Sequence, residues 1–592
     1  MIFPIPKTFI KNEGTYTFKN KLCTDDLYTF WKEILECNEV SFDSCAQLKE
    51  EAYTIDVDSD GVRISSSTEE GAYRAVTSLF QLFKRCNGEV PYLNISDDPD
   101  YKRRCYMLEI SGGRTPKLET LKEIVDLLSL LKYNEMQLYV DAFCYDYPLI
   151  PDVTEGKECL TPDDIVELDK YCKERFIDLV PNQNCFGHME AWLERDEYKH
   201  LEVGYGFGEK SGTINPLLDE TTELVNKIFD SVLPYYSSEY VNIGLDEAGG
   251  LGKYELEEYC NEHGNDTLFM ENLNRIANYI EKNYGKKVQF WSDMINNSPD
   301  SFKMIPKGAI AMEWGYEIES IRKIERHCKY YKEKGIDFYV CPSCNTHYAI
   351  TGRHENTSIV FCAAAEIGKQ NNALGYLITD WCCPGEGHPH FPVWSYMTIA
   401  LGAMYSWNIS EKMKELKMET CFDRRAREFL DFFMFESAPL SQYLQALSNY
   451  FLLEPDRTRL GTLCGMSFWQ DMSEMTYGGF FDLNDNVPSW HFDQVVWYVK
   501  DVCARIDKLN IDSRIRREIM VNANMVIMAA IVCKVKIDKT LDKETAAYFS
   551  RLADETCKEY RELWHMRNYP DGVDIAIGYI NKRKEDILSF VK

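Results

Sequence analysis

The sequence predicts an α/β fold built on a (β/α)8 TIM barrel, with a small α/β domain before the barrel and a helical domain after it. From about residue 103 to 405, short apolar runs alternate with helical patterns, and eight of these runs resemble buried strands. Eight parallel strands separated by helices in a chain of this length are typical of a (β/α)8 barrel. The predicted strands are residues 105–108, 136–140, 178–181, 240–243, 288–291, 309–312, 338–341 and 375–378.

The middle region also admits a second interpretation, a doubly wound open sheet. That fold commonly carries a glycine-rich phosphate loop after a strand, and no such loop follows any of the predicted strands. The barrel is therefore preferred, with its limits at residues 101–405.

The flanking regions have patterns of their own. In the predicted α/β domain, residues 1–100, two alternating runs at 53–57 and 62–65 enclose a turn and predict a hairpin, and an amphipathic helix follows it. Residues 406–592 show mainly helical spacing, and we expect any homodimer to form through this C-terminal domain. The clearest helical segments there are residues 411–416, 494–500 and 515–520.

Composition narrows the classes of partner. The 592 residues carry a formal net charge of -29, which argues against binding to nucleic acid or to an anionic membrane. No apolar run of membrane-spanning length and no signal-like N-terminus is expected. Twenty-one cysteines, an odd number, fit a reducing compartment better than a disulfide framework. We therefore expect a cytoplasmic protein with a small-molecule partner.

Polar residues gather where the predicted strands end, which is the face of a barrel that carries function. The clearest case is the run that ends in Asp246 and Glu247, because paired carboxylates at a strand end suit acid/base chemistry. Side chains alternate along a strand, so Asn242, Gly244 and Asp246 are predicted to share one face. The other strand ends are at residues 111–114, 141, 182–188, 291–293, 313–314, 341–345 and 379–381.

Three of these strand ends also carry a tryptophan: Trp291, Trp314 and Trp381. The flat face of tryptophan packs well against the C–H face of a sugar, and sugar hydroxyl groups require hydrogen-bond partners such as carboxylates and amides. The combination predicts a carbohydrate site.

Taken in order, four motifs resemble those of the β-N-acetylhexosaminidases of glycoside hydrolase family 20. They are Gly244-Leu245-Asp246-Glu247, Trp291-Ser292-Asp293, Glu313-Trp314-Gly315 and Phe186-Gly187-His188. The segment before Tyr101 resembles the small non-catalytic domain of that family, so the resemblance covers about residues 1–405. It implies an exo-acting, retaining enzyme that removes terminal N-acetylhexosamine, with the substrate's own acetamido oxygen as the nucleophile.

The resemblance implies roles for the matched residues. Glu247 would act as the general acid and then as the base, while Asp246 would orient the acetamido group. The three tryptophans would wall the sugar pocket, and His188 with Asp141 would support Glu247 from behind. The expected substrate-binding residues are Arg114, Asp141, His188, Trp291, Trp314, Asn345, Asp380 and Trp381.

The sequence departs from the family pattern in two places. The family commonly has an arginine after the first strand's serine, where this chain has Gly112, and Arg114 is the candidate replacement. Cys382 and Cys383 stand where an acidic residue typically follows the last tryptophan. Both departures concern recognition of sugar hydroxyls, so we expect altered preference at the 3- and 4-positions, with GalNAc or a modified hexosamine favoured.

No metal or other cofactor is expected, but cysteines near the strand ends provide an alternative. Cys185, Cys344 and Cys383 could hold Zn²⁺ that contacts the hydroxyls in place of the lost groups. A further alternative is a catalytically impaired relative that binds sugar. The intact Asp246–Glu247 pair favours the enzyme.

Overall fold

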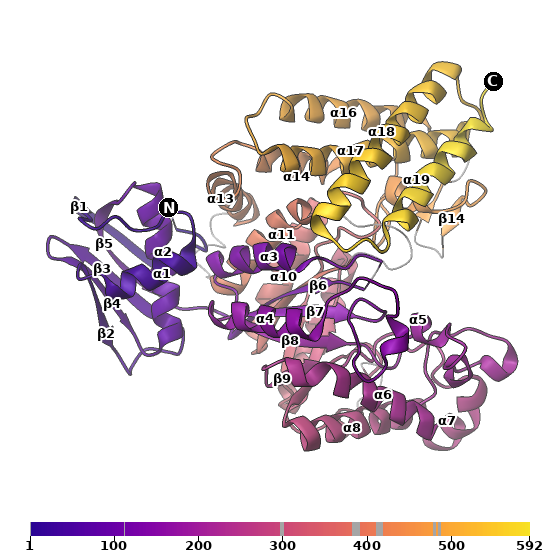
Figure 1. Cartoon of the computed structure of the whole chain (residues 1–592), viewed down its shortest axis with the longest axis horizontal. Coiled ribbons are helices and arrows are strands. Elements are labelled where there is room, and N and C mark those ends of the chain that lie inside the picture. Colours follow the sequence, from indigo (N-terminus) through magenta and orange to yellow (C-terminus); the bar gives the residue numbers. More distant parts are fainter. Residues whose placement is uncertain are drawn as a thin grey trace.

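The computed structural model has three parts, which follow one another along the chain (Figure 1). It describes the chain except residues 1, 112, 296–300, 382–390, 410–417, 478–480 and 484–486, and it describes no side chains for 418–422, 477 and 481. The predicted helical segment 411–416 therefore lies outside the described residues.

The N-terminal part is a five-stranded sheet with two helices. The strands are in the order β1-β5-β3-β4-β2, and β3 and β4 form the predicted antiparallel hairpin. Their bounds are β1 Thr8–Thr17, β2 Val40–Ser44, β3 Tyr53–Asp58, β4 Gly61–Ser66 and β5 Glu89–Asp97, and the helices are α1 Leu27–Glu36 and α2 Glu69–Arg85. Thr68 caps α2 by accepting a hydrogen bond from the Gly71 N–H.

Buried ion pairs attach this part to the barrel. Glu51 lies between the guanidinium groups of Arg74 and Arg104, which donate to its carboxylate. Burial raises the pKa of Glu51, but the two guanidinium groups outweigh it and lower the pKa to about 2. Lys132, at the end of the first barrel helix, donates to the Tyr53 hydroxyl at 2.7 Å. Because a buried charge is costly without its partner, these contacts hold the N-terminal part in one position.

The middle part is a closed barrel of eight parallel strands, which confirms the predicted fold class. The order around the barrel is β10-β11-β12-β13-β6-β7-β8-β9. Each of the eight predicted runs falls on one of these strands, with both ends within two residues of those observed. The strands are β6 Arg103–Glu109, β7 Glu135–Val140, β8 Asp178–Gln183, β9 Tyr240–Asn242, β10 Lys287–Trp291, β11 Ile310–Trp314, β12 Phe338–Cys341 and β13 Gly375–Asp380.

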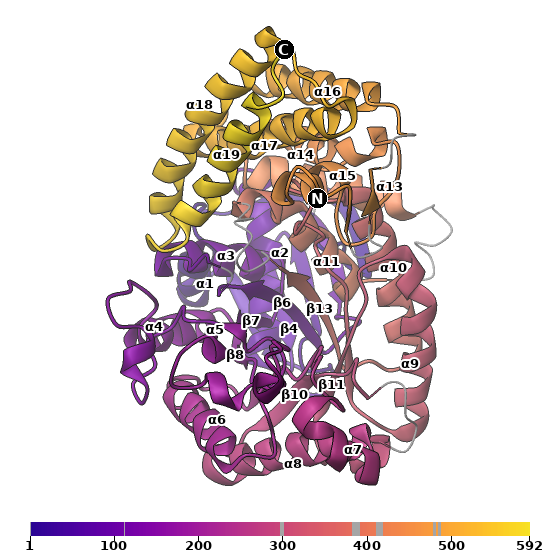
Figure 2. The same cartoon turned by 90° about the vertical axis from the view of Figure 1, so that its right-hand side faces the viewer.

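Helices surround the barrel and bury their apolar faces against it (Figure 2). They are α3 Leu118–Leu130, α4 Pro162–Lys173, α6 Asp219–Val232, α8 Asn265–Tyr284, α9 Ile321–Lys334, α10 His354–Gln370 and α11 Tyr396–Trp407. The predicted boundary at 405 falls near the end of α11. Short helices α5 Glu190–Leu193 and α7 Glu257–His263 lie in the loops at the strands' C-terminal ends.

The C-terminal part is helical and packs on the barrel beside α3 and α11 (Figure 1). Arg567 fixes this contact, because its guanidinium bridges Glu518 of the C-terminal part and Glu123 of α3. The helices are α13 Met418–Phe433, α14 Ser441–Leu447, α15 Leu463–Trp469, α16 Trp490–Ile506, α17 Ser513–Asp538, α18 Lys543–Arg567 and α19 Val573–Leu588. A two-stranded hairpin, β14 Thr476–Tyr477 and β15 Phe481–Asp482, lies between α15 and α16.

Helix α17 corrects one expectation. Its 26 residues are long and apolar enough to cross a membrane, with a mean hydropathy of 1.6 in the most apolar window, although no such run was expected. However, 83% of that window is buried inside the protein, as in the central helix of a helical domain. A single helix of this kind is weak evidence for a membrane span.

Candidate active site

A cleft of about 200 Å³ opens at the C-terminal end of the barrel strands. It contains both carboxylates of the Asp246–Glu247 pair and a set of aromatic rings. Its lining consists of Glu109, Tyr139, Asp141, His188, Asp246, Glu247, Trp314, Tyr316, His347, Tyr348, Trp381 and Leu460.

The backbone that carries the carboxylate pair is a tight turn rather than the end of a strand. Strand β9 ends at Asn242, and Gly244, Leu245 and Glu247 then have φ of 72°, 79° and 46°. The expectation that strand alternation places Asp246 is therefore wrong. Instead, the left-handed turn directs Asp246 and Glu247 into the cleft. Positive φ angles at non-glycine residues such as Leu245 and Glu247 cost conformational energy and are found mostly at functional sites.

Glycines permit the close packing around this turn. A Cβ atom on Gly244 would lie 2.2 Å from Asn184 Oδ1, and a Cβ atom on Gly187 would lie 2.2 Å from the Asp246 carbonyl oxygen. Asn184 fills the space next to Gly244 and donates from Nδ2 to Asp246 Oδ1 at 2.8 Å. Its own Oδ1 accepts from the Leu245 N–H at 3.2 Å. One buried amide thus fixes both the turn and the Asp246 carboxylate.

His188 connects the two carboxylates. Its Nε2 lies 3.5 Å from Asp246 Oδ2 and 3.4 Å from Glu247 Oε2. Burial lowers the pKa of His188, but hydrogen bonds to Asp246 and Glu247 outweigh that effect and raise the pKa to about 11. His188 is therefore protonated at neutral pH, beside both carboxylates.

Glu247 is held through its main chain, and its side chain remains more than half exposed to the cleft. The Glu247 N–H donates to Asp293 Oδ2 at 3.1 Å, and the indole of Trp314 donates to the other oxygen of Asp293 at 3.3 Å. Burial, followed by the nearby charge of Asp246, raises the pKa of Asp293 to about 7. Asp293 thus links the backbone of Glu247 to a wall of the cleft.

Asp141 lies in the same cleft, as predicted. It accepts a hydrogen bond from the Ser111 hydroxyl at 2.6 Å. Burial raises the pKa of Asp141 to about 6, although the Ser111 hydrogen bond and the charge of His188 act in the opposite direction. It adds a further acidic group close to His188.

Aromatic rings form the walls. Trp314 stacks on Tyr316 at 5.1 Å between centroids, and Trp381 meets Tyr139 edge-on at 4.7 Å. The Trp381 indole donates to the Tyr316 hydroxyl at 3.0 Å, which joins the two walls. Trp291 lies behind Trp381, with centroids 6.1 Å apart, and is almost wholly buried. Two of the three predicted tryptophans therefore line the cleft, and Trp291 supports them from inside the barrel.

Besides Trp291, three predicted substrate-binding residues do not line this cleft. Asn345 is buried, and its amide donates to the Tyr316 carbonyl oxygen and to Ser343 and Thr357, so it braces the loop after β12. Asp380 accepts from Tyr106, Thr346 and Ser395 below the cleft. Arg114 lies beside Asp380 in the lining of a separate small cavity between the barrel and the end of α18. Strand-end position identified these residues, but neighbouring polar groups direct their side chains elsewhere.

Sequence reasoning missed several lining residues. Glu109 and Tyr139 are the last or next-to-last residues of β6 and β7, so their positions at the ends of barrel strands could have marked them. Tyr316 follows Trp314 by two residues. Leu460 carried no signal at all, because it comes from the C-terminal part.

Leu460 is held at the cleft by a buried ion pair. Its N–H donates to Glu317 Oε1 at 2.8 Å, and Arg353 binds both oxygens of Glu317, at 2.7 and 2.8 Å. The following Thr462 N–H donates to the Tyr348 carbonyl oxygen at 3.1 Å. The C-terminal part therefore supplies one wall of the cleft and supports another.

The cysteines proposed for zinc are engaged in other contacts. The Cys185 thiol donates to the Ile243 carbonyl oxygen at 3.1 Å, and the Thr398 hydroxyl donates to Cys344 Sγ at 3.1 Å. Cys383, like Gly112 and Cys382, lies outside the described residues. In the described part of the chain, no three histidine, cysteine or acidic side chains form a group that could hold a metal. Zinc stays an untested prediction.

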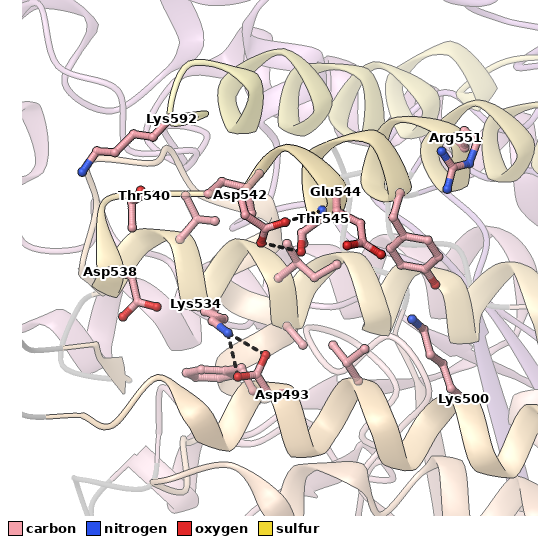
Figure 3. Close-up of a pocket in the computed structure, with 17 residues that line it drawn as sticks. Asp493, Lys500, Lys534, Asp538, Thr540, Asp542, Glu544, Thr545, Arg551 and Lys592 are labelled. Atoms are coloured by element: carbon pink, nitrogen blue, oxygen red, sulfur yellow. Dashed lines mark hydrogen bonds and ion pairs between the residues drawn. The ribbon is translucent and has the colours of Figure 1, made fainter.

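A second, larger cleft of about 650 Å³ lies on the C-terminal helices, between α16 and α18 above α17 (Figure 3). Much of its charge is paired internally: Lys534 binds Asp493 at 2.6 Å, and Asp542 caps α18 through Thr545. Lys500 lies over the ring of Tyr548, 3.9 Å from its centroid. This second cleft contains no residue that lines the Asp246–Glu247 cleft, so we place the candidate active site in the barrel.

Comparison with known proteins identifies the family of the chain. The profile for "Glycosyl hydrolase family 20, catalytic domain" matches residues 101–359, and that for "Glycosyl hydrolase family 20, domain 2" matches residues 24–98. The two matches together span more than half of the chain. The first covers the barrel strands β6 to β12, and the second covers strands β2 to β5 of the N-terminal sheet.

Individual relatives are distant. Hexosaminidase D of Homo sapiens is 26% identical over 35% of this chain and 42% of its own length, and the N,N'-diacetylchitobiase of Vibrio harveyi is 25% identical over 31% and 27%. The chain thus spans less than half the length of these two curated relatives. The solved chitobiase of Flavobacterium johnsoniae has a TM-score of 0.59 at 17% identity and covers 98% of both chains, so it shares the fold. With both profiles matched in order, the chain belongs to glycoside hydrolase family 20.

Proposed function

We propose that this protein is an exo-acting β-N-acetylhexosaminidase that removes a terminal β-linked GlcNAc or GalNAc with retention of configuration. The observation that carries the proposal is the Asp246–Glu247 pair, turned into an aromatic cleft and bridged by a protonated His188. The small cleft suits a single terminal sugar. Family membership supports hydrolysis of an N-acetylhexosaminide.

In the first step, the acetamido oxygen of the substrate attacks its own anomeric carbon, so the protein supplies no nucleophile. Glu247 donates a proton to the departing glycosidic oxygen. Its exposed carboxyl group and fixed backbone suit a general acid that must reach the leaving group. Asp246, held by Asn184, orients the acetamido N–H and stabilises the positive charge of the oxazolinium ring that forms.

In the second step, water attacks the anomeric carbon from the face that the leaving group vacated. Glu247, now ionised, takes the proton from that water, and the acetamido oxygen leaves the anomeric carbon. Two displacements at the same carbon restore the β configuration. The aromatic walls hold the sugar ring through both steps.

The proposal is tested with aryl β-glycosides of GlcNAc and GalNAc, assayed side by side. We expect wild-type activity on at least one, and we expect Glu247→Gln to reduce kcat by about 10²–10⁴-fold because the same group serves both steps. Glu223→Gln, an exposed change on α6, is the control and should leave activity unchanged. NMR of the first product formed should show the β-anomer.

Activity of Glu247→Gln within a few-fold of wild type would refute the assignment. Absence of hydrolysis by wild-type protein with either sugar, while the sugar still binds, would instead favour the sugar-binding relative. A covalent sugar trapped on a carboxylate of this chain would contradict the substrate-assisted mechanism.

Three other expectations are proposals as well. They are a cytoplasmic location, a zinc ion on cysteine and a homodimer through the C-terminal helices. The indoles of Trp490 and Trp497 support the last, because they lie seven residues apart on α16 and are 52% and 74% exposed. Residues at that spacing share one face of a helix, so they offer an apolar surface to a second copy.

A further inference from the structure

A carboxylate is buried between the barrel and helix α9, which packs on the outside of β11 (Figure 2). It belongs to Glu313, the next-to-last residue of β11, which is 1% exposed. Its Oε1 lies 2.8 Å from Nδ1 of His327 on α9, and its Oε2 lies 3.2 Å from the Ser292 hydroxyl and 3.0 Å from the Tyr331 hydroxyl. Neither Glu313 nor His327 is among the described residues that line the cleft.

Alternation along the strands explains why these groups face the helices. Trp314 packs with the apolar residues inside the barrel, so Glu313, one residue before it, faces outward. Trp291 packs inside as well, and Ser292 follows it on the outer face. Each outer polar residue is therefore joined through the backbone to an inner one: Glu313 to Trp314, and Ser292 to Asp293.

The same two strand ends are also joined on the inner side. The Trp314 indole donates to one oxygen of Asp293, and the other oxygen accepts from the Glu247 N–H. A continuous chain of contacts thus runs from α9 through Glu313 and Ser292 to Asp293, and from there to the backbone of Glu247.

The outer network is polar in a layer that is typically apolar. A buried carboxylate is costly unless it has hydrogen-bond donors, so the position of Glu313 depends on its donors. Burial, followed by the charge of Glu313, raises the pKa of Tyr331 well above its ordinary value, which keeps Tyr331 a neutral phenol able to donate. If the donor on His327 is removed, Glu313 must turn toward another group, and the end of β11 moves with it.

We propose that Glu313 and His327 are positioning residues for Glu247, the proposed general acid. They hold the ends of β10 and β11, and thereby the Asp293 carboxylate that binds the Glu247 backbone. The inference deepens the proposed hydrolase function and rests on it. Because proton transfer requires hydrogen-bonding distance to the leaving group, a small displacement of Glu247 slows the reaction even though Glu247 is still present.

Leaving groups of different basicity distinguish a misplaced acid from a general loss of structure. The experiment uses phenyl and dinitrophenyl β-glycosides of the sugar that the wild-type enzyme prefers. Phenol needs a proton to depart, whereas dinitrophenol departs as a stable anion and depends little on the acid. For both substrates, kcat/KM reports the step in which the aryl group leaves.

His327→Leu and His327→Asn form a matched pair. The two new side chains have nearly the same shape, but only asparagine keeps an N–H donor near the position of Nδ1. For His327→Leu we expect kcat/KM to fall at least about tenfold on the phenyl glycoside and less than about threefold on the dinitrophenyl glycoside. His327→Asn should stay within about threefold of wild type on both substrates, because it retains the donor.

Val125→Ala is the control for lost packing. Val125 is fully buried on α3, the helix between β6 and β7, and these strands lie opposite β10 and β11 in the order around the barrel. The change removes buried methyl groups and should lower the melting temperature. It should not alter the ratio of kcat/KM between the two substrates.

Two results in the His327 variants would overturn the inference. Equal losses on the two substrates in His327→Leu, or no loss on either, would leave the network with a role in stability alone. A loss in His327→Asn as large as that in His327→Leu would show that the donor does not matter.

Glu247→Gln distinguishes these results from failure of the proposed function. It should show the same dependence on the leaving group as His327→Leu, with a larger loss on the phenyl glycoside. Equal losses on the two substrates in Glu247→Gln would refute Glu247 as the general acid, whatever the His327 variants do.

Ser292→Ala keeps the inference testable if His327→Leu fails to fold. It removes one hydroxyl group from the same network without changing a residue of α9. We expect the ratio of kcat/KM on the dinitrophenyl glycoside to that on the phenyl glycoside to rise at least about threefold, as the loss of one hydrogen bond implies. An unchanged ratio would overturn the inference.

Discussion

Gly244→Ala tests whether the left-handed turn, rather than the strand before it, positions the carboxylate pair. Gly244 has φ of 72°, and an added Cβ atom would lie 2.2 Å from Asn184 Oδ1 and 2.8 Å from Asn184 Cα. The side chain alone cannot relieve both contacts, because the second is with backbone. Asn184 must therefore move, and with it the hydrogen bond at 2.8 Å that holds Asp246.

The cost has two components. A left-handed conformation costs a non-glycine residue about 1–2 kcal/mol. Forcing an extra methyl group into a packed site typically costs about 1–3 kcal/mol more. We therefore expect Gly244→Ala to destabilise the fold by about 2–5 kcal/mol. A misplaced Asp246 should also lower kcat/KM by about 10²-fold, the usual effect of a displacement near 1 Å.

Gly285→Ala separates the two components. Gly285 ends α8 with φ of 65°, and nothing lies within 4 Å of its added Cβ atom. Gly285→Ala should therefore lose only the conformational free energy of the left-handed backbone, and kcat/KM should stay unchanged. Thermal melting and kinetics on an aryl glycoside, run in parallel on both variants, measure the difference. If the two variants have the same melting temperature and the same kcat/KM, the packing of Asn184 against this turn does not position Asp246 and the reasoning is wrong.

Two further predictions concern groups around the cleft. Asp293 has its pKa raised from its ordinary 3.8 to about 7, so its contribution to stability is full below about pH 4 and is lost as the pH rises to 7. The melting temperature of wild type should therefore fall relative to Asp293→Asn over that range, and a constant difference would contradict this. Arg353→Ala leaves Glu317 buried without its partner, which should cost about 3–5 kcal/mol and raise KM by freeing Leu460. The double variant Arg353→Met with Glu317→Leu should recover the stability of the fold but keep the raised KM. A return of KM to the wild-type value in that variant would show that the ion pair does not position Leu460.

The motifs predict that the proposed reaction depends on Asp246, Glu247 and His188. The family resemblance suggested that Arg114 would bind the sugar hydroxyl groups. Arg114 instead lines a separate cavity and is not among the described lining residues of the cleft.

The sequence by itself determined the architecture and indicated the proposed catalytic pair. Buried parallel strands must be continuous apolar runs, so eight of them between helical patterns predicted the barrel without any knowledge of contacts. Asp246 and Glu247 follow such a run directly, and barrels place function at that end. His188, Trp314 and Trp381 could be assigned to the site because a resemblance in motif order placed them at neighbouring strand ends.

Tertiary structure decided which polar groups line the cleft. Asn345 and Asp380 occupy strand ends like the others, but partners distant in the sequence, among them Tyr106 and Tyr316, fix their side chains outside the cleft lining. Leu460 reaches the cleft only because Glu317 and Arg353 hold its loop there. The local sequence pattern indicates the secondary structure and the buried positions. The direction of a side chain, in contrast, depends on hydrogen bonds between segments far apart in the chain.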